Sequence, residues 1–318
     1  LFEGLKIMQL EKEWKQYPVI RLDMSRGGAN AGTLHSYLNL RFAYYEDKYS
    51  IIPAPTAGLA DRFDAIITTA CRQTGLNVAI LIDEYDSPLQ HSWNTPEHDE
   101  CTEVYREVFA ILKADDEYQR FVFITGITKF TQISLFSVLN NLTNISFLPE
   151  YVAICGITEE EVKENFKPEL ENMAKANGWT LQQTHDNLKD YYDGYHFSRR
   201  NMTDIYNPFS LINALDTQDL NSYWASSGAT SMLSKFIKDV ELHLPNYENC
   251  MILRNTLETS DVTGGGPELF LYQSGYLTIK SCTGNVYHLG FPNEEVKQAL
   301  YECVLPALTM RQVADTQT

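Results

Sequence analysis

The sequence has no long apolar run, no paired cysteines and no excess of basic residues. None of its apolar stretches approaches the roughly 20 residues that span a bilayer, so we expect no membrane segment. No charged-then-apolar leader opens the printed chain, which gives no indication of secretion. Its six cysteines are scattered without a C-x-x-C pair, a usage typical of buried thiols in a reducing cytoplasm rather than of a zinc site or disulfide framework.

Basic residues are too few for strong, non-specific nucleic-acid binding. The chain carries 25 Lys and Arg against 42 Asp and Glu, a net charge of −17. Such binding needs clustered positive charge, which no third of the chain supplies. The seven histidines show no H-E-x-x-H or similar metal-binding spacing. A length of 318 residues predicts two or three domains of a globular protein.

The most informative stretch is a short apolar run that stops at two acids. Residues 77–86 read NVAILIDEYD, so Asp83 and Glu84 directly follow the run. The run is too short for a helix and rich in β-branched residues, which predicts a strand buried on both faces of a parallel sheet. Ligands of such sheets bind outside the carboxyl ends of the strands, where these two acids would lie.

This pattern has the form of a Walker B strand. The first acid, Asp83, would hold Mg²⁺, usually through water. The second acid, Glu84, would orient or deprotonate the water that attacks a γ-phosphate. The alternative is a core strand that ends in a solvated acidic turn.

Further strands are predicted at 17–23 and 121–125, and helices between the strands complete an α/β fold. Thr125 ends its strand, as Asp83 does, and its hydroxyl would sense the γ-phosphate or simply complete a strand-end hydrogen bond. Lys129 is a second candidate for a phosphate contact, against the alternative of a solvated lysine.

A glycine-rich loop at 27–33 follows the first strand and resembles a phosphate-binding loop. The lysine that should follow Gly32 is missing, and Thr33 stands in its place. The loop is therefore predicted to be a plain connection between strand and helix. A second loop is predicted over the polar residues 91–100.

The second half of the chain changes character. A capping box formed by Thr158 and Glu161 opens helices predicted at 159–176 and 180–192, a helical lid without strands. Residues 228–260 are predicted to be helical. A short helix and two strands within 269–292 then suggest a winged-helix-like module, before Asn293 caps a last helix. The predicted domains are an α/β core over 1–155, a lid over 156–226 and a winged-helix-like segment over 227–318.

Nine short motifs in this order resemble the bacterial AAA-ATPase-like proteins of the Bacteroidetes type, which usually end in a PD-(D/E)xK nuclease-like domain. The motifs are YPVI at 17–20, LIDEYD at 81–86, FITG at 123–126, ICGITEEE at 154–161, YDGY at 192–195, YNPFS at 206–210, YW at 223–224, GYLT at 275–278 and LGFPNEE at 289–295. The resemblance implies a P-loop NTPase-like parallel sheet with helices on both faces, followed by the lid and the winged-helix-like segment. It implies ATP and Mg²⁺ as cofactors, with Asp83 and Glu84 as catalytic residues and Thr125, Asp86 and Lys129 at the nucleotide.

The resemblance also places the family's glycine-lysine-serine phosphate loop before the segment that matches residues 1–6, and its nuclease-like domain after the helix that follows Asn293. We therefore expect residues 1–318 to form half of an ATP site and to act as a regulatory or switch part of a larger cytoplasmic protein. The expected partners are a nucleotide and the nuclease-like domain, with no membrane. The alternatives are a non-catalytic interaction module, or a DNA-binding protein acting through the winged helix.

Overall fold

A computed structural model describes residues 2–127, 141–224, 247–259 and 266–303. The chain divides into two compact units, one formed by residues 1–127 with 131–142 and the other by the residues that follow, with 128–130. Each unit is described by itself. The predicted division at 155 and 226 remains a prediction.

The first unit is built on a three-stranded parallel sheet. The strands are β1 (Val19–Asp23), β2 (Val78–Asp83) and β3 (Gln119–Ile124), in the order β1-β2-β3. Asp23 of β1 lies opposite Asp83 of β2 in the register. All three strands run in the same direction, so their carboxyl ends meet at one edge of the sheet. The predicted α/β sheet is present, with β2 at its centre.

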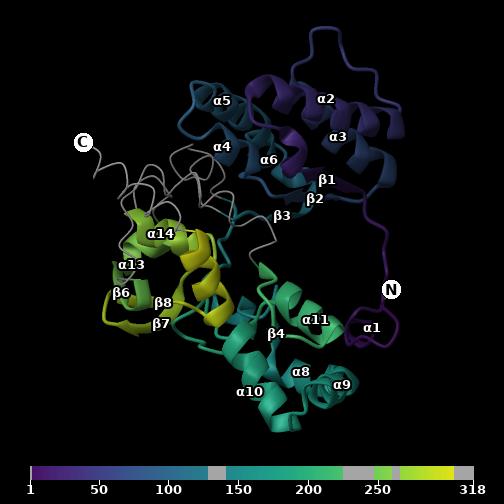
Figure 1. The fold of residues 1–318 in the computed structure, drawn as a ribbon. Helices are drawn as coiled ribbons and strands as arrows, with labels where there is room; N and C mark the ends of the chain where they lie inside the picture. Colours follow the sequence, from purple (N-terminus) through teal and green to yellow (C-terminus); the bar gives the residue numbers. More distant parts are fainter. Residues whose placement is uncertain (1, 128–140, 225–246, 260–265, 304–318) are drawn as a thin grey trace, which may run out of the picture. The chain divides into compact units, whose positions relative to one another are not determined.

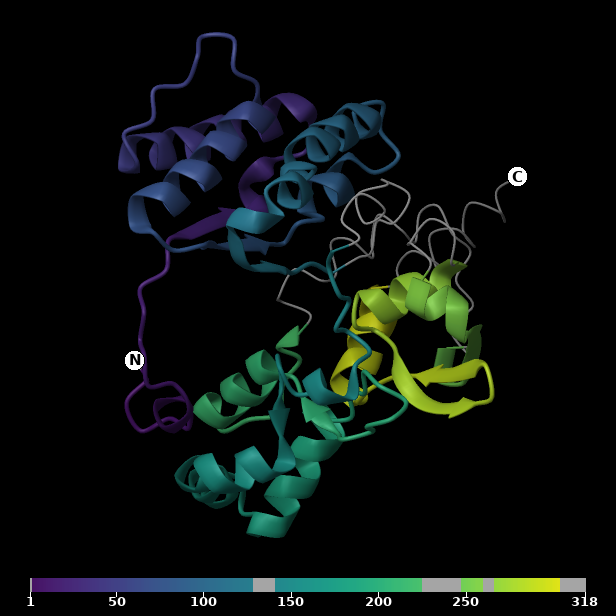
Figure 2. The ribbon, with the colours of Figure 1, turned by 180° about the vertical axis from the view of Figure 1, so that it is seen from behind.

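The main helices of this unit lie together on one side of the sheet (Figures 1 and 2). These helices are α2 (Ala31–Lys48), α3 (Leu59–Thr74), α4 (Ser87–Ser92), α5 (His98–Phe109) and α6 (Ile111–Ala114). A short helix before β1, α1 (Ile7–Leu10), buries none of its residues and is not part of this layer. The apolar stripes of α2 and α3 are buried. Gly75 ends α3 with a φ of 65°, a left-handed conformation that glycine adopts without strain. These helices cover the core side of the sheet.

The two faces of the sheet are not equally buried. Ile20, Leu22, Ile80 and Ile82 are at most 2% exposed, because they face the helices. The alternate residues of β2 are only half-buried. One face of β2 is therefore buried and the other is half-buried, so the strand is less buried than predicted, and helices on the second face of the sheet remain a prediction.

The outer edge of β1 is closed by side chains rather than by another strand. The backbone N–H of Arg21 donates to the hydroxyl of Tyr45 (2.7 Å), and that of Asp23 donates to the hydroxyl of Tyr37 (2.8 Å). Both tyrosines come from α2. An edge strand leaves such groups unpaired unless something covers them, so this helix fixes the position of β1.

Of two loops predicted in this unit, one is present as predicted and the other is shorter. The glycine-rich loop is a connection as predicted, and its Asn30 and Thr33 form a reciprocal capping box that begins α2. The loop predicted over 91–100 is shorter than expected, since α4 extends to Ser92 and α5 begins at His98, which leaves residues 93–97 as the loop. Pro88 had suggested a break, but proline is tolerated in the first turn of a helix, where it stands in α4.

The second unit begins with the helices predicted as a lid. They are α8 (Glu159–Asn165), α9 (Lys167–Asn177), α10 (Leu181–Tyr192) and α11 (Pro208–Thr217), and they share one apolar core. The capping box of Thr158 and Glu161 is present. The helix predicted over 159–176 is two helices, because Pro168 begins a new one. The prediction of no strands was wrong, since β4 (Ile157–Thr158) pairs with β5 (Ile205–Tyr206).

The remaining described elements form a small antiparallel sheet with helices. They are β6 (Cys250–Leu253), α13 (Arg254–Thr259), α14 (Gly266–Gln273), β7 (Thr278–Thr283) and β8 (Val286–Gly290), with strand order β6-β8-β7. The predicted hairpin is present, and Asn293 Oδ1 accepts from Val296 N (3.1 Å) at the start of the helix at 294–303. The helical prediction for 228–260 was wrong at β6, and its residues 228–246 lie outside the described part.

Across the described ranges, no helix combines the length and the apolar character that a membrane span requires.

Candidate functional site

The carboxyl end of β2 brings together the two acids that the sequence singled out and a threonine from the next strand. Asp83 is the last residue of β2, and Glu84 follows it. Thr125 follows β3 directly, and its backbone N–H donates to the carbonyl of Ile82 (2.9 Å). The parallel pairing of β2 with β3 therefore sets Thr125 beside Asp83, across more than forty residues of sequence.

Thr125 and Asp83 are in direct contact. The hydroxyl of Thr125 donates to Asp83 Oδ1 at 2.7 Å, and the same hydroxyl lies 3.4 Å from the backbone N–H of Glu84. The hydroxyl of Thr125 thus fixes Oδ1 of Asp83, while Oδ2 takes no part in this hydrogen bond. The hydroxyl of Thr125 completes a hydrogen bond at the end of the strand, which is one of the two roles predicted for it. The other role, contact with a γ-phosphate, stays a prediction.

Glu84 has an unusual backbone and an unusual carboxyl group. Its φ of 48° lies in the left-handed region, which costs a non-glycine residue free energy and is typical of functional positions. Desolvation, and then the negative charge of Asp83, raise the pKa of the Glu84 side chain. The side chain is exposed, so it is available to water and ligand at this edge.

Asp86 is placed differently from the other predicted site residues. Its side chain is 1% exposed, and its two oxygens accept from the backbone N–H of Ile127, at 3.3 Å and 3.1 Å. Gln90 also donates to this carboxylate. These contacts hold the turn after β3 next to the turn after β2. Lys129, the remaining candidate, lies outside the described residues.

Two residues of β1 belong to the site although the sequence did not single them out. Arg21 donates from its guanidinium to Asp83 Oδ2 (3.3 Å). Asp23 lies opposite Asp83 in the sheet and accepts a hydrogen bond from Ser25 (2.6 Å). The signal for Asp23 was available, because it ends an apolar strand just as Asp83 does. Nothing in the sequence could pair Arg21 with a residue 62 positions away.

The donor atoms at this edge suit Mg²⁺ held through water. They are the oxygens of Asp83, Glu84 and Thr125, and Mg²⁺ prefers one or two carboxylates together with waters and phosphates. The guanidinium of Arg21 shows that Asp83 Oδ2 accepts a cation. No cluster of three or more His, Cys, Asp or Glu side chains capable of holding a metal occurs in the described ranges, so a fully protein-built cage is not part of this arrangement.

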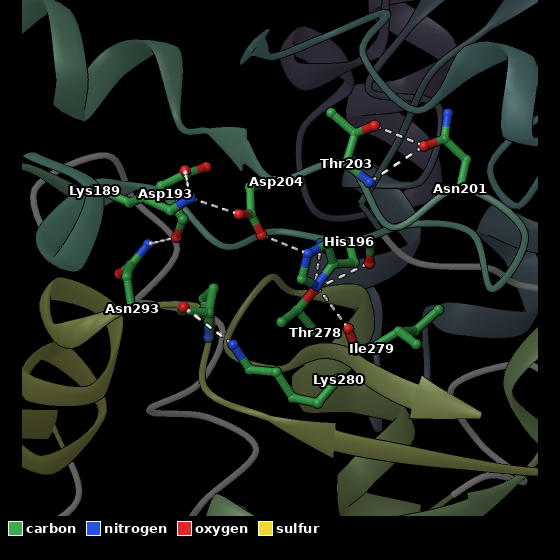
Figure 3. A network of polar contacts seen from close by, with 11 residues as sticks. Lys189, Asp193, His196, Asn201, Thr203, Asp204, Thr278, Ile279, Lys280 and Asn293 are labelled. Atoms are coloured by element: carbon green, nitrogen blue, oxygen red, sulfur yellow. Dashed lines mark hydrogen bonds and ion pairs between the residues drawn. The ribbon is translucent and has the colours of Figure 1, made fainter. Parts of the chain in front are cut away.

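A second polar network lies in the other unit, around the end of α10 (Figure 3). Lys189 Nζ is 2.9 Å from Asp204, and His196 Nε2 is 2.7 Å from the other oxygen of Asp204. Burial opposes the charge on Asp204, but the hydrogen bonds from Lys189 and His196 lower its pKa. His196 Nδ1 also faces the carbonyl of Ile279 (2.9 Å). These contacts join the lid helices to β7.

Asp193 is the unusual member of this network. Its side chain is fully buried, and neither carboxylate oxygen has a hydrogen-bond partner among the described residues. Burial raises its pKa to about 7. The nearest cation, Lys189, is 3.9 Å away. Asn293 donates to the backbone carbonyl of Asp193 (2.9 Å), which ties the helix at 294–303 to the end of α10.

A comparison with known protein families concerns the first unit. Residues 1–136 match a family model, AAA-ATPase_like, described as "Predicted AAA-ATPase". The matched segment contains all three strands and the Asp83–Thr125 contact. The match therefore supports an AAA-ATPase-like module in this part of the chain, in agreement with the parallel sheet and with the resemblance seen in the sequence.

A longer relative matches almost the whole chain. It is an "Uncharacterized protein in vnfD 5'region" of Azotobacter chroococcum mcd 1, 30% identical over 98% of this chain and 60% of its own length. The chain thus spans about three fifths of the curated relative that it matches. The alignment with this relative therefore extends well beyond residues 1–136, the part that the family model covers.

Proposed function

We propose that this chain is the ATP- and Mg²⁺-dependent nucleotide module of a larger protein, in which it acts as a regulatory switch. The observation that carries the proposal is the hydrogen bond from Thr125 to Asp83 at the carboxyl edge of a parallel sheet. The match of residues 1–136 to an AAA-ATPase-like family supports it.

Each residue at the edge has a defined role in this proposal. Asp83 would hold Mg²⁺ through water, oriented by its hydrogen bond from Thr125. Mg²⁺ would bridge and neutralise the phosphate oxygens. Glu84 would accept or direct the proton of the attacking water, and its raised pKa makes its carboxylate a stronger base. Thr125 would report the presence of the γ-phosphate to the turn that Asp86 holds.

The phosphate-binding loop of the site would lie next to β3. In the described residues β3 pairs with β2 alone, and Phe121 on this strand is 53% exposed. Parallel sheets are normally covered on both faces, and the open edge of a strand offers unpaired backbone groups to a further strand. A phosphate-binding loop carried by a strand that pairs with β3 would face Thr125 and Asp83 directly. Lys129 remains a proposed phosphate contact.

The second unit would carry the switch function. The nuclease-like domain implied by the resemblance is proposed as the partner that responds to nucleotide binding. The greater length of the Azotobacter relative is compatible with such an additional domain. The lid helices of this unit would couple the two, since they follow the nucleotide-binding edge in sequence.

A DNA-binding role is the weaker candidate. It would use the segment in which α13 and α14 follow β6 and precede the hairpin of β7 and β8, the order of elements expected of a winged helix. In such modules the second helix reads the DNA groove. Here α14 contains no Lys or Arg, and its Leu269, Phe270 and Leu271 are at most 1% exposed. The segment is better suited to packing than to phosphate contact.

The proposal is tested by nucleotide binding in the protein encoded by the complete gene. Calorimetric titration with ATP should show binding that requires Mg²⁺ and that Asp83→Asn weakens at least tenfold. The matched control is Asp47→Asn, which makes the same charge change on an exposed part of α2. Equal affinities of the wild-type protein and Asp83→Asn for Mg²⁺·ATP would refute the assignment.

A further inference from the structure

The ion pair between Arg21 and Asp83 joins neighbouring strands along one face of the sheet. Arg21 lies opposite Leu81 in the register, and Asp83 is two residues further along β2. Side chains two residues apart on a strand share a face, so Arg21 and Asp83 are diagonal neighbours on that face. The guanidinium reaches Asp83 Oδ2 at 3.3 Å, while Thr125 occupies Oδ1.

The backbone of Arg21 is fixed, but its side chain is held weakly. Its backbone N–H donates to Tyr45, and its carbonyl accepts from Arg41 (3.2 Å). The side chain is 61% exposed and makes one contact of 3.3 Å, longer than the usual 2.7–2.9 Å of a charge-assisted hydrogen bond. Exposed pairs of this kind contribute little free energy. A stronger cation can therefore displace the guanidinium without moving β1.

The surrounding charges explain why a counter-cation is needed in the metal-free state. Asp23 and Glu84 add two more acids beside Asp83, since Asp23 lies opposite Asp83 in the sheet and Glu84 follows it in the chain. Carboxylates at such spacing repel one another unless a cation lies between them. Arg21 provides that cation from the face of the sheet.

We propose that Arg21 is a displaceable counter-cation of Asp83, which occupies the carboxylate when metal is absent and which Mg²⁺ must displace to bind. This inference rests on the proposed function, because it concerns the same metal position. Arg21 is then a residue that sets the affinity of the site for the divalent cation. It acts by competing for Asp83 Oδ2, while Thr125 keeps the carboxylate oriented in both states.

The test is a titration with Mn²⁺, a paramagnetic substitute for Mg²⁺, followed by electron paramagnetic resonance in the protein from the complete gene and without nucleotide. Arg21→Ala should bind Mn²⁺ about two- to fivefold more tightly than wild type, the range expected from losing one exposed ion pair. Arg21→Lys, which keeps the charge, should remain near wild type. Arg72→Ala removes the same charge from an exposed position on α3 and should change nothing.

Asp83→Asn separates this inference from the proposed function. Loss of Mn²⁺ binding in Asp83→Asn, together with tighter binding in Arg21→Ala, supports both. Loss of binding in Asp83→Asn with unchanged or weaker binding in Arg21→Ala overturns the role of Arg21 and leaves the metal assignment intact. Unchanged binding in Asp83→Asn, or no Mn²⁺ binding by any of the proteins, overturns both.

Discussion

Asp193→Asn is expected to stabilise the second unit at neutral and alkaline pH. The carboxylate of Asp193 is fully buried without a hydrogen-bond partner among the described residues, and Lys189 is 3.9 Å away. Burying a charge in this way costs more free energy than burying a neutral amide of similar shape. The substitution therefore removes a cost and retains the packing.

The size of the effect follows from the pKa of Asp193. Burial raises it from its ordinary value of 3.8 to about 7. A pKa change of this size lowers the free energy of unfolding by at most about 4 kcal/mol when Asp193 is fully ionised. Because the pKa of the folded state is raised, the cost is absent below about pH 4, grows between pH 4 and 7, and is complete above pH 7. After loss of the attraction to Lys189, we expect a gain of about 1–3 kcal/mol at pH 8.

The assay is calorimetric unfolding between pH 4 and 8.5, where a gain of this size raises the midpoint of the second unit by several degrees. The gain should shrink towards zero as the pH falls to 4. Asp190→Asn is the matched control, since it makes the same charge change at an exposed position on the same helix, α10. An Asp193→Asn protein that is less stable at pH 8, or whose gain does not depend on pH, would refute the reasoning.

Three further substitutions test the structure around β2 and β3 by thermal unfolding. Thr125→Ala should lower the stability of the first unit by about 1 kcal/mol, whereas Thr125→Ser, which keeps the hydroxyl that donates to Asp83, should not. Asp86→Ala should cost about 2–3 kcal/mol, because the buried carboxylate that holds the backbone N–H of Ile127 and the side chain of Gln90 is lost. Gly126→Ala should cost about 1–3 kcal/mol, because its Cβ would lie 2.5 Å from Asp86 Oδ1, while Gly32→Ala, with 3.4 Å to its nearest neighbour, should be neutral.

The strands and the position of the acids could be predicted because local sequence determines them. The apolar run that ends at Asp83 predicts the strand β2 and its end, and the run before Thr125 predicts β3 in the same way, although none of the residues of β3 is buried. Capping residues such as Thr158 and Asn293 fixed helix starts for the same reason. Their partners lie within three residues, so the sequence contains the whole interaction.

Burial and pairing between distant residues could not be predicted in this way. The half-buried second face of β2 depends on which helices cover it, and the run of apolar residues does not reveal that. The partner of Arg21 is set by strand register, and the burial of Asp193 is set by the contact between the end of α10 and Asn293, a hundred residues further along the chain. Polar residues inside a structure acquire their role from such contacts, which appear only once the chain is folded.

Single-turnover ATP hydrolysis by the Glu84→Gln variant of the protein from the complete gene tests the central claim most directly. The variant keeps the size of the side chain and the Asp83–Thr125 pair but removes the carboxylate that would handle the attacking water. We predict that Glu84→Gln binds Mg²⁺·ATP with near wild-type affinity and hydrolyses it at least a hundredfold more slowly. Hydrolysis at the wild-type rate in Glu84→Gln would contradict the assignment of this edge as a nucleotide-hydrolysing site.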